Sequence, residues 1–157
     1  MIVVSDTGPL VYLVSIGIGH FLPQMYGSVY VPPAVLAELQ HEHSPLKDWI
    51  AAAPEWLKIE TPFPLISDSS LDLGEREAIS IALNLEADVV LIDEKAGRHA
   101  AQTFGLAVTG TLGVIVDGHL KKLFNGLDAL DRLAQTNFYA SAELLQAVRS
   151  SIDGSNS

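Results

Sequence analysis

The chain has no cysteine among its 157 residues, and this absence removes several kinds of site at once. It excludes disulfide bonds, zinc sites built on thiolates, and catalysis by a thiol nucleophile. Basic residues are also scarce, since 9 lysines and arginines stand against 19 acids and leave a formal net charge of −10. That balance argues against a broad basic surface for nucleic acid, whereas it allows an acidic site that holds a divalent cation.

A long uninterrupted apolar run is missing as well. No Asp, Glu, Lys or Arg occurs between Asp6 and Glu38, yet glycine and proline break this stretch repeatedly. A helix that crosses a bilayer needs about 20 consecutive apolar residues. No Lys or Arg precedes the stretch and Asp6 interrupts it, which argues against a signal peptide. We therefore expect a cytoplasmic protein with no membrane span, whose uncharged stretch forms a buried strand and helix and an apolar face for a dimer.

Short β-branched runs alternate with helical patterns along a chain that is 48% apolar. Strands are expected at residues 2–4, 28–31, 56–60, 88–92 and 107–109. Helices are expected at residues 7–15, 34–40, 45–53, 71–86, 94–103 and 112–117, and within 128–149. This alternation predicts an α/β fold, a three-layer α/β/α sandwich around a mainly parallel sheet. We expect one domain over residues 1–150 and a disordered tail over residues 151–157.

Two of the expected strands end in an acid. The first strand runs into Asp6, and the fourth runs into Asp93, which Glu94 follows. Ligands of parallel sheets bind at the carboxyl ends of the strands. Each acid can also be explained as the cap of the next helix, a position that aspartate suits. Two acids at corresponding strand ends favour a shared site over two independent caps.

Two further acids lie on expected helices. In the helix over residues 71–86, Glu75 falls near the middle of the apolar face, whereas Glu77 falls at the edge of the polar stripe. An inward carboxylate costs several kcal/mol unless it is paired or bound to a metal. Glu75 is therefore the stronger candidate for a buried role, with Glu77 as the alternative. An ion pair of Glu75 with Arg98 or Lys95 would also explain its inward position. Glu38 lies in a short helix, where a solvated face would also explain it.

Asp6, Glu38, Glu75 and Asp93 would form an all-oxygen site if they converge. Two carboxylates about 4 Å apart repel by about 4 kcal/mol at an effective dielectric constant of about 20, so four of them require a cation. Oxygen ligands suit Mg²⁺ or Mn²⁺, and such ions activate water for displacement at a phosphodiester. The five histidines show no metal spacing, which argues against zinc.

Five short motifs occur in order along the chain: VVSDTGPL at 3–10, VPPAVLAEL at 31–39, LGEREAI at 73–79, LIDEKAGR at 91–98 and TGTLG at 109–113. Their order and spacing resemble the PIN-domain family, in particular its compact, toxin-like single-domain members, over about residues 2–120. The resemblance implies a PIN-like α/β/α sandwich and an endoribonuclease that depends on Mg²⁺ or Mn²⁺ and hydrolyses RNA.

The catalytic carboxylates that the resemblance implies are Asp6, Glu38, Glu75 and Asp93. Of these, Asp6, Glu75 and Asp93 would hold the metal. Glu38 would bind a second ion or orient the attacking water, and the hydroxyl of Thr7 would lie near the metal or phosphate. The family usually has Asp at the third position, so the longer Glu leaves Glu77 as an alternative there. At the fourth position Glu94 competes with Asp93.

Partners also follow from the resemblance, which implies a homodimer and a small antitoxin protein. Lys95 and Arg98, one turn past Asp93, would meet RNA phosphates, unless they are ordinary surface residues. Other functions stay open: an aspartate-nucleophile phosphatase, although Gly8 stands where that chemistry needs a second Asp; a receiver-like regulatory module; and a catalytically silent PIN-like module that binds nucleic acid or protein. The complete set of four acids argues against the silent module.

Overall fold

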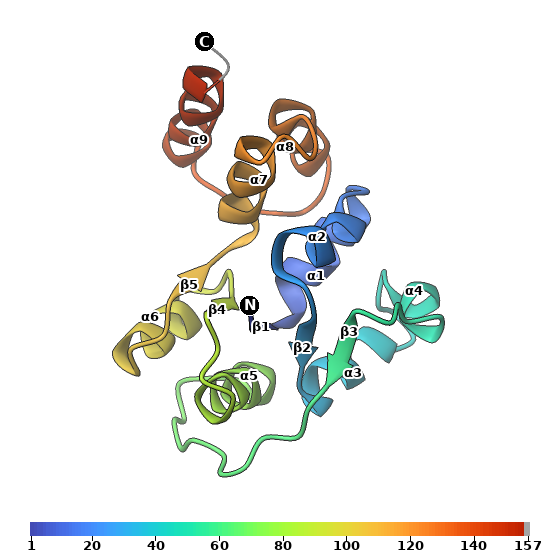
Figure 1. Ribbon diagram of the computed structural model, residues 1–157, viewed down its shortest axis with the longest axis vertical. Helices are drawn as coiled ribbons and strands as arrows, with labels where there is room; N and C mark the ends of the chain where they lie inside the picture. The colour runs from blue at the N-terminus through green and yellow to red at the C-terminus, as the bar shows by residue number, and fades with distance from the viewer. Residues whose placement is uncertain (156–157) are drawn as a thin grey trace.

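The computed structural model describes residues 1–155 of the chain (Figure 1). At its centre is a five-stranded, entirely parallel sheet with the strand order β3-β2-β1-β4-β5. The strands are β1 Val3–Ser5, β2 Val29–Val31, β3 Leu57–Ile59, β4 Val89–Leu91 and β5 Val108–Thr109. These are the strands that the sequence predicts, so the parallel α/β architecture is confirmed.

The strands are short and rich in valine because both faces of the sheet are covered. Val3 and Val4 are both fully buried although they point to opposite faces. Val3 belongs to one apolar core and Val4 to another. Burial on both faces is the ordinary condition of a parallel sheet, and it explains why these strands do not alternate between apolar and polar residues.

Helices form the two outer layers. On the face of Val3 pack α1 Thr7–Ser15, the 3₁₀ turn Gly19–Phe21, α2 Leu22–Tyr26, α3 Pro33–Gln40, α4 Lys47–Ala51, α7 Thr111–Leu120, α8 Gly126–Leu133 and α9 Ala142–Ser155. On the face of Val4 pack α5 Leu73–Asn84 and α6 Lys95–Thr103. In Figure 1 the orange-to-red helices α7, α8 and α9 gather at one end of the molecule. The three-layer sandwich is therefore confirmed.

The uncharged stretch over residues 7–37 lies largely inside the first core. Leu10, Leu13 and Leu22 are almost fully buried there, which accounts for the lack of charge without a membrane. Within residues 1–155, no helix is both long enough and apolar enough to span a bilayer.

The end of the chain is more ordered than the sequence suggests. Helix α9 continues to Ser155 and so includes residues 151–155, which were expected to form a tail. The physical reason is Ile152, which is fully buried in the first core and anchors the last helical turns. The remaining residues of the expected tail, 156 and 157, lie outside the described part of the chain.

The strand order fixes where a site can form. The chain adds β2 and β3 on one side of β1, then crosses back to add β4 and β5 on the other. In parallel sheets such a reversal opens a crevice at the carboxyl ends of the two strands between which it occurs. Here those strands are β1 and β4, the two that run into Asp6 and Asp93.

Candidate active site

Asp6 lies at the carboxyl end of β1, next to β4, where the strand order reverses. Its backbone N–H donates to the carbonyl of Leu91 at 2.9 Å, which fixes it against β4. Although it occupies the N-cap position of α1, its side chain makes no capping hydrogen bond. The residue is only 7% exposed. Helix capping therefore does not explain this buried carboxylate.

Three carboxylates from different elements face one point beside Gly74, at the start of α5. A Cβ at that position would lie 3.1 Å from Glu38 Oε1, 3.4 Å from Asp6 Oδ1 and 3.4 Å from Asp72 Oδ1. We call this arrangement the acidic cradle. Glycine contributes no side chain there, so the carboxylate oxygens border a space that a single Cβ would fill. The other oxygen of Glu38 accepts a hydrogen bond from the hydroxyl of Thr7, which orients Glu38 toward the cradle.

Asp72 is the member of the acidic cradle that sequence reasoning missed. It caps α5, since its Oδ1 accepts from the N–H of Glu75 at 2.7 Å and Glu75 Oε1 accepts from the N–H of Asp72 at 3.1 Å. An Asp followed three residues later by Glu is the sequence signal of such a capping box. That signal explains Asp72 as a helix cap. Only the tertiary arrangement shows that the same carboxylate also lies near Asp6 and Glu38.

Glu75 is buried, as its helical spacing predicts, with 5% of its surface exposed. One carboxylate oxygen completes the capping box, while Oε2 is buried with no hydrogen-bond partner. This oxygen lies over Gly97 of α6, where a Cβ would come within 2.4 Å of it. An ionisable oxygen that is buried and unpaired is costly, and a bound cation would remove that cost.

Glu77, the alternative to Glu75, is already engaged. Its Oε1 accepts the N–H of Ala34 at 3.1 Å, at the start of α3. The N-terminus of a helix carries unsatisfied N–H groups and partial positive charge, which a carboxylate stabilises. This contact gives Glu77 a structural role between α5 and α3, and the geometry favours Glu75 as the ligand.

Asp93 follows β4 and lies next to the acidic cradle rather than in it. Both of its oxygens are held by Thr111 at 2.7 Å, Oδ1 by the backbone N–H and Oδ2 by the hydroxyl. Glycines surround it, since a Cβ at Gly8 would lie 3.5 Å from Oδ2 and one at Gly110 would lie 2.8 Å from Oδ1. Glu94, its competitor, is exposed at the start of α6. The geometry thus favours Asp93.

The pKa values of two of these acids are raised, as expected for buried carboxylates that repel one another. Burial raises the pKa of Asp6 to about 7, and the charges of Asp72, Glu75 and Glu38 add to the rise. Burial also raises the pKa of Glu75, with further contributions from Asp72 and Glu94. Perturbed carboxylates gathered in a crevice are typical of functional sites.

These residues fit a divalent cation in their chemistry. As they are placed within residues 1–155, no three acid or histidine side chains lie close enough together to hold a metal ion. The acidic cradle nevertheless offers carboxylate oxygens around a space that a single Cβ would fill, and Glu75 adds an unpartnered one. Oxygen-only donors suit Mg²⁺ or Mn²⁺ and not zinc.

Comparisons with known proteins agree with this architecture. A family model described as PIN domain matches residues 2–153. Among solved structures, the chain is similar to a PilT N-terminus domain protein, SSO1118, from the hyperthermophilic archaeon Sulfolobus solfataricus P2. The two share 12% identity with a TM-score of 0.51, over 90% of this chain and 100% of the other, which shows a common fold. The comparison with curated proteins gave no match.

Proposed function

Because this chain belongs to the PIN-domain family, whose members are usually nucleases, we propose that it is a metal-dependent endoribonuclease that hydrolyses RNA phosphodiesters. The observation that carries the proposal is the acidic cradle, where carboxylates from three elements face one space at the crevice between β1 and β4. The two strands that flank this crevice are the ones that end in Asp6 and Asp93.

The residues that would hold the ion are Asp6, Glu75 and Asp93, with Asp72 as a further ligand from the cradle. A bound Mg²⁺ or Mn²⁺ would supply an activated water and stabilise negative charge on the phosphate oxygens during in-line displacement. The donor chemistry supports this assignment, because all of these side chains offer only oxygen.

Other residues hold the catalytic carboxylates in place or would contact the RNA. The hydroxyl of Thr7 holds Glu38 so that its free oxygen faces the acidic cradle, from where it would orient the attacking water or bind a second ion. Thr111 fixes both oxygens of Asp93 and so holds this carboxylate in one orientation. Lys95 and Arg98 lie in α6 beyond Asp93 and would contact phosphates of the RNA.

The experiment that tests the function combines metal binding with RNA cleavage. Mn²⁺ is titrated into the purified chain by calorimetry, and cleavage of single-stranded RNA is followed with Mg²⁺ or Mn²⁺ present. Asp6→Asn and Glu75→Gln are expected to weaken metal binding and to lower cleavage by about 100-fold or more. Glu77→Gln is the matched control, because it lies on the same helix and keeps an acceptor for the N–H of Ala34.

The outcomes separate catalysis from binding. Metal binding that both variants lose, together with metal-dependent cleavage, supports the nuclease. A wild-type chain that binds neither ion would overturn it and leave a catalytically silent module as the better explanation. If Glu77→Gln loses metal while Glu75→Gln keeps it, the nuclease stands and the assignment of the third acid is wrong.

The partners stay predictions of the family resemblance. We propose that the chain forms a homodimer and is inhibited by a small antitoxin protein. Light scattering of the purified chain tests the first prediction. Co-purification with the product of a small neighbouring gene tests the second, and loss of RNA cleavage in that complex is the expected result.

A further inference from the structure

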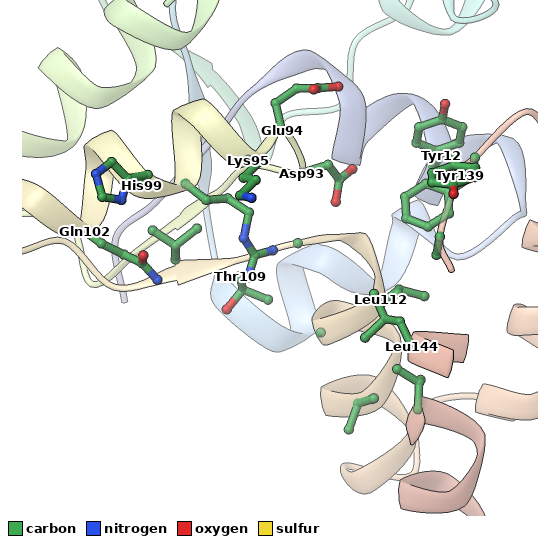
Figure 2. Close-up of a pocket in the computed structure, with 18 of the residues that line it drawn as sticks. Tyr12, Asp93, Glu94, Lys95, His99, Gln102, Thr109, Leu112, Tyr139 and Leu144 are labelled. Carbon is green, nitrogen blue, oxygen red and sulfur yellow. The ribbon is translucent and has the colours of Figure 1, made fainter. Parts of the chain in front are cut away.

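A groove of about 970 Å³ runs past Asp93, between α6 and the C-terminal part of the chain (Figure 2). Its walls come from α6, β5, α7, α9 and the segment over residues 137–140, with Tyr12 of α1 beside that segment. We call it the Asp93 groove. Its volume is at the upper end of the range for ligand sites. Asp93 and Glu94 are the acids in its lining, so the groove meets the candidate active site at one end.

One wall of the Asp93 groove is cationic. Lys95 and Arg98 line it, and neither forms an ion pair with an acid in the part of the chain that the structure describes. Arg132 and Arg149, in contrast, pair with acids of α8. Lys95 and Arg98 balance the two acids of the lining, so on a chain with a net charge of −10 the hollow is a place where phosphates can contact cations.

The opposite wall presents an aromatic ring. Tyr139 is 88% exposed although the two residues before it are held in place by Tyr12. The hydroxyl of Tyr12 donates to Asn137 Oδ1 at 3.0 Å, and its ring contacts Phe138 edge-on with 5.0 Å between centroids. These contacts hold the backbone next to Tyr139 while its own ring packs against little. Figure 2 shows Tyr12 and Tyr139 on one side of Asp93 and Lys95 on the other.

The base of the Asp93 groove is apolar. Leu112 of α7 and Leu144 of α9 line it, and Leu144 leaves 49% of its surface exposed. The groove therefore offers cations on one side, an exposed aromatic ring on the other, and aliphatic side chains between them. Single-stranded nucleic acid is bound by this combination, since phosphates contact cations and the freed bases stack on aromatic rings.

We propose that the Asp93 groove binds the single-stranded RNA that leads to the scissile phosphate, with one base stacked on Tyr139 and the neighbouring phosphates at Lys95 and Arg98. This inference rests on the proposed nuclease function and adds to it the groove that holds the strand and a positioning residue. Tyr139 acts by holding the strand and takes no part in the chemistry. The two unpaired cations favour an anionic strand over a protein segment, and a duplex cannot offer an unstacked base to the ring.

The test measures RNA binding apart from cleavage. A short unpaired RNA, labelled at one end with fluorescein, is titrated with protein in EDTA, and Kd is read from fluorescence anisotropy. Tyr139→Ala is expected to raise Kd about 5- to 150-fold, while Tyr139→Phe keeps wild-type affinity. Arg98→Gln is expected to lower the slope of log Kd against log salt concentration by about 1.

Matched controls lie outside the Asp93 groove. Phe63→Ala removes an aromatic ring that is 87% exposed, and Lys58→Gln removes an exposed cation on β3, at the other edge of the sheet. Both are expected to bind RNA as the wild type does. A duplex of the same sequence is expected to bind more weakly than the single strand.

The possible results separate this inference from the proposed function. If the chain cleaves RNA but Tyr139→Ala and Arg98→Gln bind it with unchanged Kd, the groove inference is overturned and the nuclease remains. If RNA binds through Tyr139 yet is never cleaved with Mn²⁺ present, the groove inference stands and the nuclease fails. If the wild type does not bind single-stranded RNA at all, the groove inference is overturned and a protein segment becomes the better occupant.

Discussion

At the scale of single residues, Asp6 is a carboxylate that folding makes costly to ionise. Burial raises its pKa from the ordinary value of 3.8 to about 7, and the nearby acids Asp72, Glu75 and Glu38 contribute. A raised pKa means that the folded state binds the proton more tightly than the unfolded chain. The resulting contribution to stability is complete below pH 3.8 and is lost as the pH rises through about 7.

Asp6→Asn is therefore expected to stabilise the metal-free protein at pH 8, because the amide stays neutral. The gain in unfolding free energy reaches up to about 4 kcal/mol and shrinks as the pH falls toward 5. Urea unfolding in EDTA at a series of pH values measures it. Asp48→Asn, which changes an exposed acid of α4, is the control and should show no such trend. A gain that is the same at pH 5 and pH 8 would contradict the explanation.

Gly97 is required by the position of Glu75. A Cβ at this position would lie 2.4 Å from Glu75 Oε2 and 2.9 Å from Ile92 Cγ2, so something must move. Gly97→Ala is expected to lower the unfolding free energy by about 1–3 kcal/mol. In a double-mutant cycle with Glu75→Ala, part of this loss should be recovered, with a coupling energy of about 0.5–3 kcal/mol. Strictly additive losses would show that the two residues do not interfere.

At the scale of elements, the site depends on how α5 and α3 are joined. Glu77 of α5 accepts the N–H of Ala34 at the start of α3, and α3 carries Glu38 into the acidic cradle. Glu77→Ala is expected to cost about 1 kcal/mol of stability, as the loss of a helix cap does, and to lower cleavage through the displacement of Glu38. Glu77→Gln should restore both, which unfolding and cleavage assays on the same preparations can check. Full activity in Glu77→Ala would show that the contact between Glu77 and Ala34 is not needed to position Glu38.

At the scale of the whole molecule, we expect the net charge of −10 and the gathered acids to make the fold sensitive to divalent ions. An ion that binds only the folded state raises the free energy of unfolding by about 2.7 kcal/mol when its concentration is about 100 times its Kd. For a chain of this length the melting temperature should rise by about 5–10 °C with Mn²⁺ and return after EDTA. Differential scanning calorimetry measures the shift. Asp6→Asn should respond less than the Glu77→Gln control, and an equal response would place the ion elsewhere.

The sequence by itself determined the five strands and most of the helices, but not the 3₁₀ turn and α2 over residues 19–26. It also determined the inward direction of Glu75 and the acids at the ends of two strands. These are local properties, since periodicity and strand ends can be read from neighbouring residues. The tertiary structure alone decided that Asp72 joins Asp6 and Glu38, and that Thr111 holds both oxygens of Asp93. It alone decided that Tyr139, Lys95 and Arg98 line one groove. These contacts depend on strand order and helix packing, which bring together residues that are distant along the chain. Local sequence patterns therefore cannot predict them.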